Sequence, residues 1–303
     1  MILTHHVPAD ITPCVYPTPR WQRRPFALTT YPSSRRHDFV TTSAGNNEAT
    51  FLLNATHVVQ MQPLYRCTPG SPLLARWHPE WINDATGLHV TDLRGEGALG
   101  AHGGTGLSAI GGTIRRGELN ATAPPIRHAL KLELNARRFY FCADFTKRET
   151  CFRWPAITAD SYAVKKDDPG SRYNGTNPDL QPGSLLAMSS DDAALVRPKL
   201  KTEVARRMLG ALVGFGAYIV DDAAGNYDPR GKTNICYETG VEAEVAEQYD
   251  GLALTASPGH PLFDDFTAIV QSLSAVTNNG PNAVGGGGAP VAERPLPLCA
   301  LSV

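Results

Sequence analysis

The sequence predicts a mainly β fold, a β-sandwich/jelly-roll-like domain with two packed α-helices and extended terminal arms. Three observations predict this class: short segments that alternate with a period of two, two stretches with helical periodicity, and ends rich in proline or glycine. A chain of 303 residues can bury a large core. We expect an N-terminal arm over residues 1–45, the domain over residues 46–280 and a C-terminal arm over residues 281–303.

The two arms are predicted from their composition. Residues 1–45 contain five prolines up to Pro25 and show no sustained period of 2 or 3.6. Residues 281–303 open with a glycine run and continue with several prolines. Within the first arm, residues 26–30 and 39–42 are candidate strands. We expect both arms to dock, either on their own domain or on neighbouring copies of the chain.

Strand periodicity is clearest in the middle of the chain. Residues 126–134, "IRHALKLEL", place leucines on one face and Ala129, Lys131 and Glu133 on the other. Residues 137–145, "RRFYFCADF", alternate in the same way, so the two segments are predicted to be adjacent antiparallel strands with one buried face. Residues 217–223, "AYIVDDA", are predicted to form a further buried strand.

Two helices are predicted by 3.6-residue periodicity. Residues 202–216 carry an apolar stripe, with Thr202 as the N-cap and glycines at the end. Residues 261–280 begin with Pro261 at the first helical position, carry acids in the first turn and end at Asn279 and Gly280.

A glycine-rich stretch, "GAHGGTGLSAIGGTIRRGEL" at residues 100–119, allows three interpretations. The preceding "GEGALG" at residues 95–100 matches the dinucleotide-binding spacing, but the glycines that follow do not permit the required helix. The sequence favours a sheet corner where glycines adopt positive φ. The remaining interpretation is a glycan-binding groove on a jelly-roll face, lined by polar side chains. Its candidate residues are Asp92, Arg94, Glu96, His102 and His128.

Charge and motif content exclude several functions. The net charge of -1 provides no field that would attract nucleic acid, and no apolar run is long enough to span a membrane. The sequence contains no CxxC, HExxH or GxSxG motif, so we assign no catalytic residue and expect no metal and no cofactor. The acids in "DDAAGNYDPRG", residues 221–231, lack calcium-loop spacing and are predicted to form an exposed turn.

Cysteines and sequons point to an oxidising compartment. Cys142 and Cys151 flank a predicted hairpin and are expected to form a disulfide. Cys14 and Cys299 lie in the arms and are candidates for bridges to Cys67, to Cys236 or to each other. Three Asn-X-Thr sequons lie in polar, turn-like surroundings and are candidate N-glycosylation sites. They are Asn54, Asn120 and Asn174.

The combination of several of these segments resembles a group of uncharacterised secreted microbial proteins. The shared elements are the AHGG, GLS and IGGTIR parts of residues 101–115, followed by HALK, WPA and a block similar to YGAYVVDD. The resemblance covers residues 85–290 and implies secretion, although the start "MILTHHVPAD" lacks the apolar stretch of a signal peptide. The arm, the sequons and the domain together also resemble protomers of glycosylated extracellular fibrils from fresh water.

These observations predict a structural subunit of an extracellular glycosylated filament. An extended arm would add a strand to an open sheet edge of the next copy, and such head-to-tail contacts propagate when they do not close. The partners are then other copies of the chain and covalent N-linked glycans. The alternative is a secreted carbohydrate-active enzyme or lectin that uses the jelly-roll groove. An enzyme is the less favoured class.

Overall fold

The computed structural model describes residues 100–287 with gaps at 101, 103, 109–110, 166–167, 169, 224–232, 239 and 255–257. Before residue 100 it describes the backbone of six short strands. Most of both predicted arms therefore lies outside the described residues. Among the described helices, none combines the length and the apolarity needed to cross a membrane.

The six N-terminal strands form two small antiparallel sheets. One has the order β1-β5-β4, built from β1 (Phe26–Ala27), β5 (Leu74–Ala75) and β4 (Leu64–Tyr65). The other has the order β2-β3-β6, built from β2 (Ala49–Leu52), β3 (His57–Met61) and β6 (His89–Asp92). Strand β1 belongs to the predicted N-terminal arm and pairs with β5 of its own chain.

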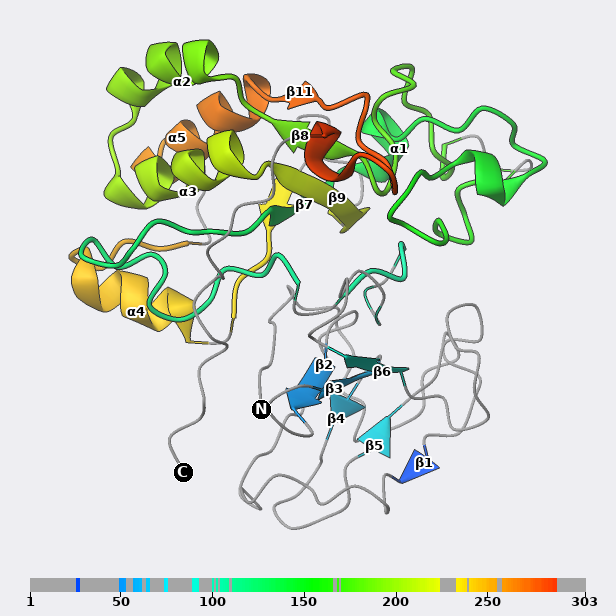
Figure 1. Ribbon diagram of the computed structural model, residues 1–303, viewed down its shortest axis with the longest axis horizontal. Helices are drawn as coiled ribbons and strands as arrows, with labels where there is room; N and C mark the ends of the chain where they lie inside the picture. Colours follow the sequence, from blue (N-terminus) through cyan, green and yellow to red (C-terminus); the bar gives the residue numbers. More distant parts are fainter. Residues whose placement is uncertain are drawn as a thin grey trace.

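A five-stranded mixed sheet is the centre of the described part (Figure 1). Its order is β10-β7-β9-β8-β11, where only β7 and β9 run parallel. The strands are β7 (Leu130–Leu134), β8 (Leu185–Ala187), β9 (Ala217–Asp222), β10 (Thr233–Ile235) and β11 (Ser274–Ala275). The strands predicted at 126–134 and 217–223 are thus present as β7 and β9, whereas the sandwich or jelly roll stays a prediction.

The predicted pairing of residues 126–134 with 137–145 is wrong. Immediately after β7 the chain forms α1 (Ala136–Phe139), because the Asn135 side chain accepts a hydrogen bond from the Arg138 backbone N–H and caps the turn. Strand β7 instead lies between β10 and β9. All five of its residues are buried, so its Lys131 and Glu133 face is covered rather than solvated.

The two predicted helices are confirmed with adjusted ends. Helix α3 (Glu203–Gly214) begins after Thr202, whose hydroxyl accepts a hydrogen bond from the Ala205 N–H. Helix α5 (Pro261–Gln271) has Pro261 in its first turn but ends at Gln271, with Ser272 as its C-cap, before the predicted Asn279 and Gly280 stop. The remaining helical elements are α2 (Ser190–Val196), α4 (Val241–Gln248) and the 3-10 turns η1 (Arg148–Thr150), η2 (Arg197–Lys199) and η3 (Val284–Gly286).

A buried carboxylate joins the two long helices. Asp265 of α5 accepts hydrogen bonds from the Thr202 N–H and hydroxyl, each at 2.7 Å, and from the Lys201 N–H at 2.9 Å. The negative charge therefore lies at the N-terminus of α3, where the helix dipole favours it. This acid, predicted only as a first-turn residue of α5, fixes α5 against α3.

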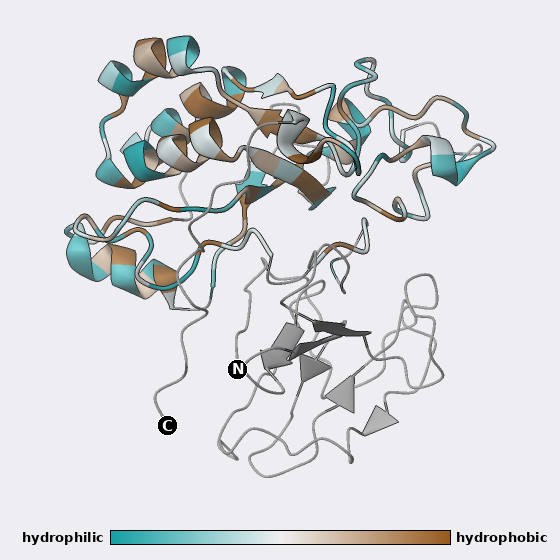
Figure 2. Ribbon diagram, viewed as in Figure 1, coloured by the Kyte–Doolittle hydropathy of each residue, from teal (hydrophilic) through white to brown (hydrophobic). Residues whose placement is uncertain are grey.

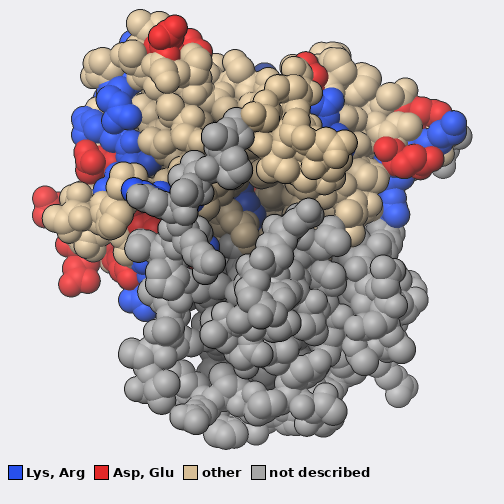
Figure 3. Space-filling model, viewed as in Figure 1, with Lys and Arg blue, Asp and Glu red and all other residues tan. Residues whose placement is uncertain are grey.

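The hydrophobic core lies between the sheet and the helices. Helices α2, α3 and α5 lie together on one side of the sheet (Figure 1), and apolar residues concentrate on β9 and on the inner sides of the helices (Figure 2). The β7 leucines and the apolar stripes of α3 and α5 belong to one core cluster. On the face shown in Figure 3, side chains of both signs lie at the two ends of the described part, so no single-sign field arises there.

We predict that Leu209→Ala destabilises the protein by about 2–5 kcal/mol, because Leu209 of α3 is fully buried and truncation leaves a cavity. The control is Leu195→Ala in α2, where the side chain is 67% exposed and little apolar area is lost. Urea unfolding measures both variants. Equal losses for the two substitutions would contradict this description of the core.

Candidate metal centre

A register shift between β7 and β9 determines which side chains share the polar face of the sheet. Leu132 is paired with Ile219, but the next pair is Glu133 with Asp221. Val220 is therefore an extra residue in β9, a bulge that brings Asp221 opposite Glu133. Glu133 is completely buried and Asp221 is 4% exposed.

The glycine-rich stretch covers this face. His102 and Leu107 are joined by a backbone hydrogen bond of 2.9 Å, and the Gly106 N–H donates to the His102 carbonyl. The Thr105 hydroxyl donates to the Val220 carbonyl at 2.7 Å, which fastens the loop to β9. The stretch is therefore a loop over the polar face, and not the predicted sheet corner. It places His102, which is completely buried, beside β7 and β9.

Gly104 shows why this loop needs glycine. Its φ is +70°, in the left-handed region that other residues rarely adopt. A Cβ at this position would lie 2.6 Å from Oδ1 of Asp221 and 3.4 Å from Oδ2 of Asp160. The backbone of the loop thus approaches the carboxylates more closely than any side chain would permit.

Cys236 reaches the same place from β10. Strand β10 pairs antiparallel with β7, and Cys236 follows its last residue, with the Cys236 N–H donating to the Lys131 carbonyl. The side chain is a buried, reduced thiol. Of the alternative bridges considered for the arm cysteines, the one to Cys236 is therefore not formed in this structure.

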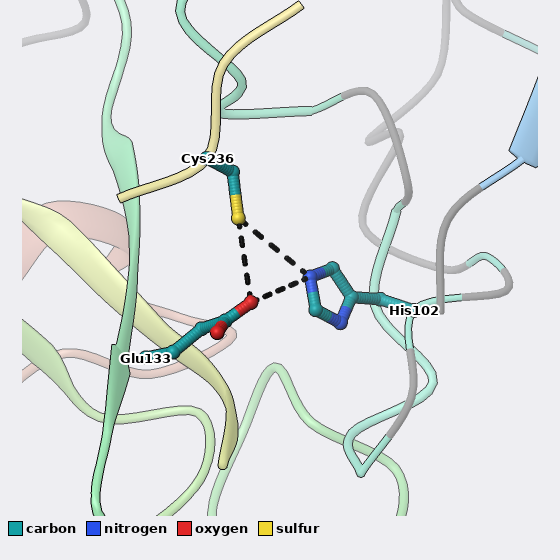
Figure 4. Close-up of side chains that lie close together, drawn as sticks. All are labelled: His102, Glu133 and Cys236. Carbon is teal, nitrogen blue, oxygen red and sulfur yellow. Dashed lines mark hydrogen bonds and ion pairs between the residues drawn. The ribbon is translucent and has the colours of Figure 1, made fainter. Parts of the chain in front are cut away.

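Three donor atoms converge at this point (Figure 4). Cys236 Sγ lies 3.6 Å from Glu133 Oε1 and 4.0 Å from His102 Nε2. His102 Nε2 lies 3.9 Å from Glu133 Oε1, so one donor atom from each residue falls within 4.8 Å of the other two. On the other side of the ring, His102 Nδ1 lies 3.5 Å from Asp221 Oδ2.

This geometry allows two chemical interpretations. In a cysteine nucleophile activated by a base, an imidazole accepts the proton of the thiol and a carboxylate orients the imidazole. The same three kinds of group lie together here. Glu133 argues against such a nucleophile, because a carboxylate 3.6 Å from the sulfur disfavours a second negative charge there. A cation between the sulfur and the carboxylate removes that conflict. The arrangement therefore fits metal ligation better than nucleophilic catalysis.

Further acids surround the three donors. Burial is the main cause that raises the pKa of Asp221. Burial also raises the pKa of Asp160, to about 8, and the nearby charge of Asp221 is the next largest cause of that increase. Asp222 turns away and accepts hydrogen bonds from the Ala136 N–H at 2.9 Å and the Tyr162 hydroxyl at 2.6 Å. The predicted exposed acidic turn is therefore wrong for Asp221, which is buried, and for Asp222, which is mostly buried. Residues 224–231 of that predicted turn lie outside the described residues.

Of the five residues of the predicted glycan groove, the structure describes the side chains of His102 and His128. His102 is buried under the loop, whereas His128 pairs with Glu118 at 3.0 Å. Asp92 is the last residue of β6 and its side chain is not described. Arg94 and Glu96 lie outside the described residues. His102 therefore has no exposed surface to offer a glycan, and the rest of the predicted groove stays a prediction.

The predicted modification and cross-linking sites are only partly described. Asn174 is exposed, and Asn120 is partly exposed with Oδ1 accepting hydrogen bonds from Thr122. The sulfurs of Cys142 and Cys151 lie 1.94 Å apart, at disulfide distance, although the segment between them contains η1 instead of a strand hairpin. The other candidates lie outside the described residues. They are Asn54, Cys14, Cys67 and Cys299.

Sequence reasoning identified His102 as a polar residue in a glycine loop but missed Glu133, Cys236 and Asp221 as its neighbours. Glu133 and Cys236 are 103 residues apart, and His102 and Cys236 are 134 residues apart, so no short motif connects them. One signal was present: a lysine and a glutamate alternate with leucines in β7. That pattern occurs both when the polar face of a strand is exposed to water and when another segment of the chain covers it, so it does not identify a buried site.

We predict that Gly104→Ala is more destabilising than Gly117→Ala, by more than about 1 kcal/mol. Both glycines have positive φ, +70° and +83°, so both variants carry the same type of backbone strain. Only at Gly104 would the new Cβ collide with Asp221, while Gly117 has nothing within 4 Å. Thermal unfolding compares the variants, and equal losses would mean that the loop does not close on Asp221.

Comparisons with known proteins add no assignment to this site. No protein-family model matches the sequence, and no curated protein and no solved structure matches it either. The chemistry of the site therefore has to be argued from its own geometry.

Proposed function

We propose that this chain is a metalloprotein in which His102, Glu133 and Cys236 bind one divalent cation, with Zn2+ as the first choice. The convergence of the three donor atoms within 4.8 Å carries the proposal. In a tetrahedral zinc site with bonds of about 2.0 Å to nitrogen and oxygen and 2.3 Å to sulfur, such donors are about 3.3–3.5 Å apart. The observed separations of 3.6, 3.9 and 4.0 Å need only small side-chain adjustments.

The donor types select the class of metal. Imidazole, carboxylate and thiolate together suit a borderline cation such as Zn2+, whereas Ca2+ and Mg2+ prefer oxygen ligands alone. A thiolate at Cys236 and a carboxylate at Glu133 together carry two negative charges, which would balance the two positive charges of the cation. Because burying unpaired charge is costly, the cation also offsets the desolvation of these groups.

The position of the site supports a role in holding the fold together. Its donors come from the glycine-rich loop, from the inner strand β7 and from the residue that follows β10. A metal bound to all three would connect segments 103 and 134 residues apart along the chain. Metal ligation of this type contributes directly to folding free energy, because the assembled site does not exist in the unfolded chain.

We predict that the metal-free protein binds one Zn2+ per chain, and that Cys236→Ser weakens or abolishes this binding. Zinc at about 100 times its dissociation constant should add about 2.7 kcal/mol of stability. Mass spectrometry gives the metal content per chain, calorimetric titration gives the affinity, and thermal unfolding gives the added stability. His128→Gln is the control, since that histidine pairs with Glu118 outside the three donors. Unchanged zinc binding by Cys236→Ser, or no binding by the unmodified chain, would contradict the proposal.

The filament subunit predicted from the sequence is a second candidate function, compatible with a structural metal. The exposed side chain of Asn174 favours it, because a sequon must be accessible to carry a glycan. The disulfide distance between Cys142 and Cys151 also fits an extracellular setting. In this proposal the chain assembles with other copies through its arm, and N-linked glycans cover the outer surface.

We predict that the chain, expressed in a glycosylating host, carries a glycan on Asn174. Enzymatic deglycosylation should lower its intact mass, and Asn174→Gln should remove one glycan. Asn177→Gln is the control, since this exposed neighbour is not part of a sequon. Electron microscopy of the full chain tests assembly separately. An Asn174 that stays unmodified would contradict the glycosylation proposal, and particles that remain single at high concentration would contradict the filament.

A further inference from the structure

Asp221 lies behind the imidazole of His102, on the side away from the three converging donor atoms. Its Oδ2 is 3.5 Å from His102 Nδ1, while His102 Nε2 faces Glu133 and Cys236. We infer that Asp221 is a positioning residue that holds His102 with Nε2 available to the metal. This inference rests on the proposed metal site and adds a residue that acts on the metal only through His102.

The bulge in β9 supports this assignment. Leu132 pairs with Ile219, so an uninterrupted register would continue with Glu133 opposite Val220 and Leu134 opposite Asp221. Because neighbouring residues of a strand point to opposite faces, Asp221 would then share the face of Leu134, which belongs to the hydrophobic core. The extra residue moves Asp221 onto the face of Glu133 instead.

Asp221 is itself held in place. Its Oδ1 accepts a hydrogen bond of 2.8 Å from the Asp222 N–H, and a Cβ added at Gly104 would lie 2.6 Å from the same oxygen. The other oxygen, Oδ2, is thereby directed at the histidine ring. A carboxylate in this position favours the tautomer that carries the proton on Nδ1, which leaves the Nε2 lone pair free for a metal.

Because Asp221 Oδ1 accepts the hydrogen bond from the Asp222 N–H, the effect of the isosteric substitution Asp221→Asn on His102 can be predicted. In Asp221→Asn, the amide oxygen would remain the acceptor for the Asp222 N–H, so the amide NH2 group would face His102 Nδ1. An NH2 donor there favours the tautomer with the proton on Nε2, the atom that should ligate the metal. Replacing a group that orients a metal-bound histidine lowers metal affinity by about 10–100-fold.

Asp222 provides a matched control in the next position of the strand. Its carboxylate accepts hydrogen bonds from the Ala136 N–H and the Tyr162 hydroxyl, and neither group belongs to the metal site. Asp222→Asn therefore removes the same charge one residue away without changing what faces His102. A general effect of charge or stability on metal binding would appear in both variants.

The experiment is a Zn2+ titration of the full chain and of both variants, combined with 15N NMR of the His102 ring nitrogens. We expect the dissociation constant to rise about 10–100-fold for Asp221→Asn and to stay near that of the unmodified chain for Asp222→Asn. In the zinc-loaded unmodified chain, Nε2 should show the shift of a metal-bound nitrogen and Nδ1 should carry a proton.

Each failure has a distinct meaning. If the unmodified chain binds no zinc, the proposed metal site itself is wrong. If it binds zinc and Asp221→Asn binds equally tightly, or if both variants lose affinity equally, the positioning role is overturned. The NMR measurement needs no variant, so it decides the question even if Asp221→Asn does not fold: a metal on Nδ1 would overturn the inference.

Discussion

One extra residue in β9 determines which ionisable side chains meet in this protein. The parallel pairing of β7 with β9 places leucines on the helix side, and the shift at Val220 brings Asp221 beside Glu133 on the other side. The position of Asp221 behind His102 depends on that placement. The loop carrying His102 covers these acids, and Cys236 joins them because β10 pairs with the opposite edge of β7.

Burying the ionisable groups of the polar face away from water costs free energy, and hydrogen bonds and the proposed metal site reduce that cost. Hydrogen bonds satisfy part of it, as where the Asn234 side-chain amide donates to Glu133 Oε2 at 3.2 Å. The donor atoms of His102, Glu133 and Cys236 differ from these hydrogen bonds in that one atom of each residue converges on the same point, within 4.8 Å of the other two. The proposed cation would bind at that point, and it would then contribute to the fold alongside the leucine core.

The sequence predicted those elements that depend on local patterns. Leucine alternation located β7, and Thr202 together with an apolar stripe located α3. The failures have physical causes. Asn135 caps a helical turn where alternation alone indicated a second strand. The Lys131 and Glu133 face has the same pattern whether water or a loop covers it. The donors converge only through strand pairing, and a bulge cannot be recognised from one sequence.

X-ray absorption spectroscopy of the zinc-loaded protein is the sharpest test of the proposed metal site, because it reports the ligands around the metal. We expect one sulfur at about 2.3 Å and nitrogen or oxygen ligands at about 2.0–2.1 Å, including an imidazole contribution. A shell of oxygen or nitrogen ligands alone, without sulfur, would contradict it, since zinc would then be bound somewhere other than between His102, Glu133 and Cys236.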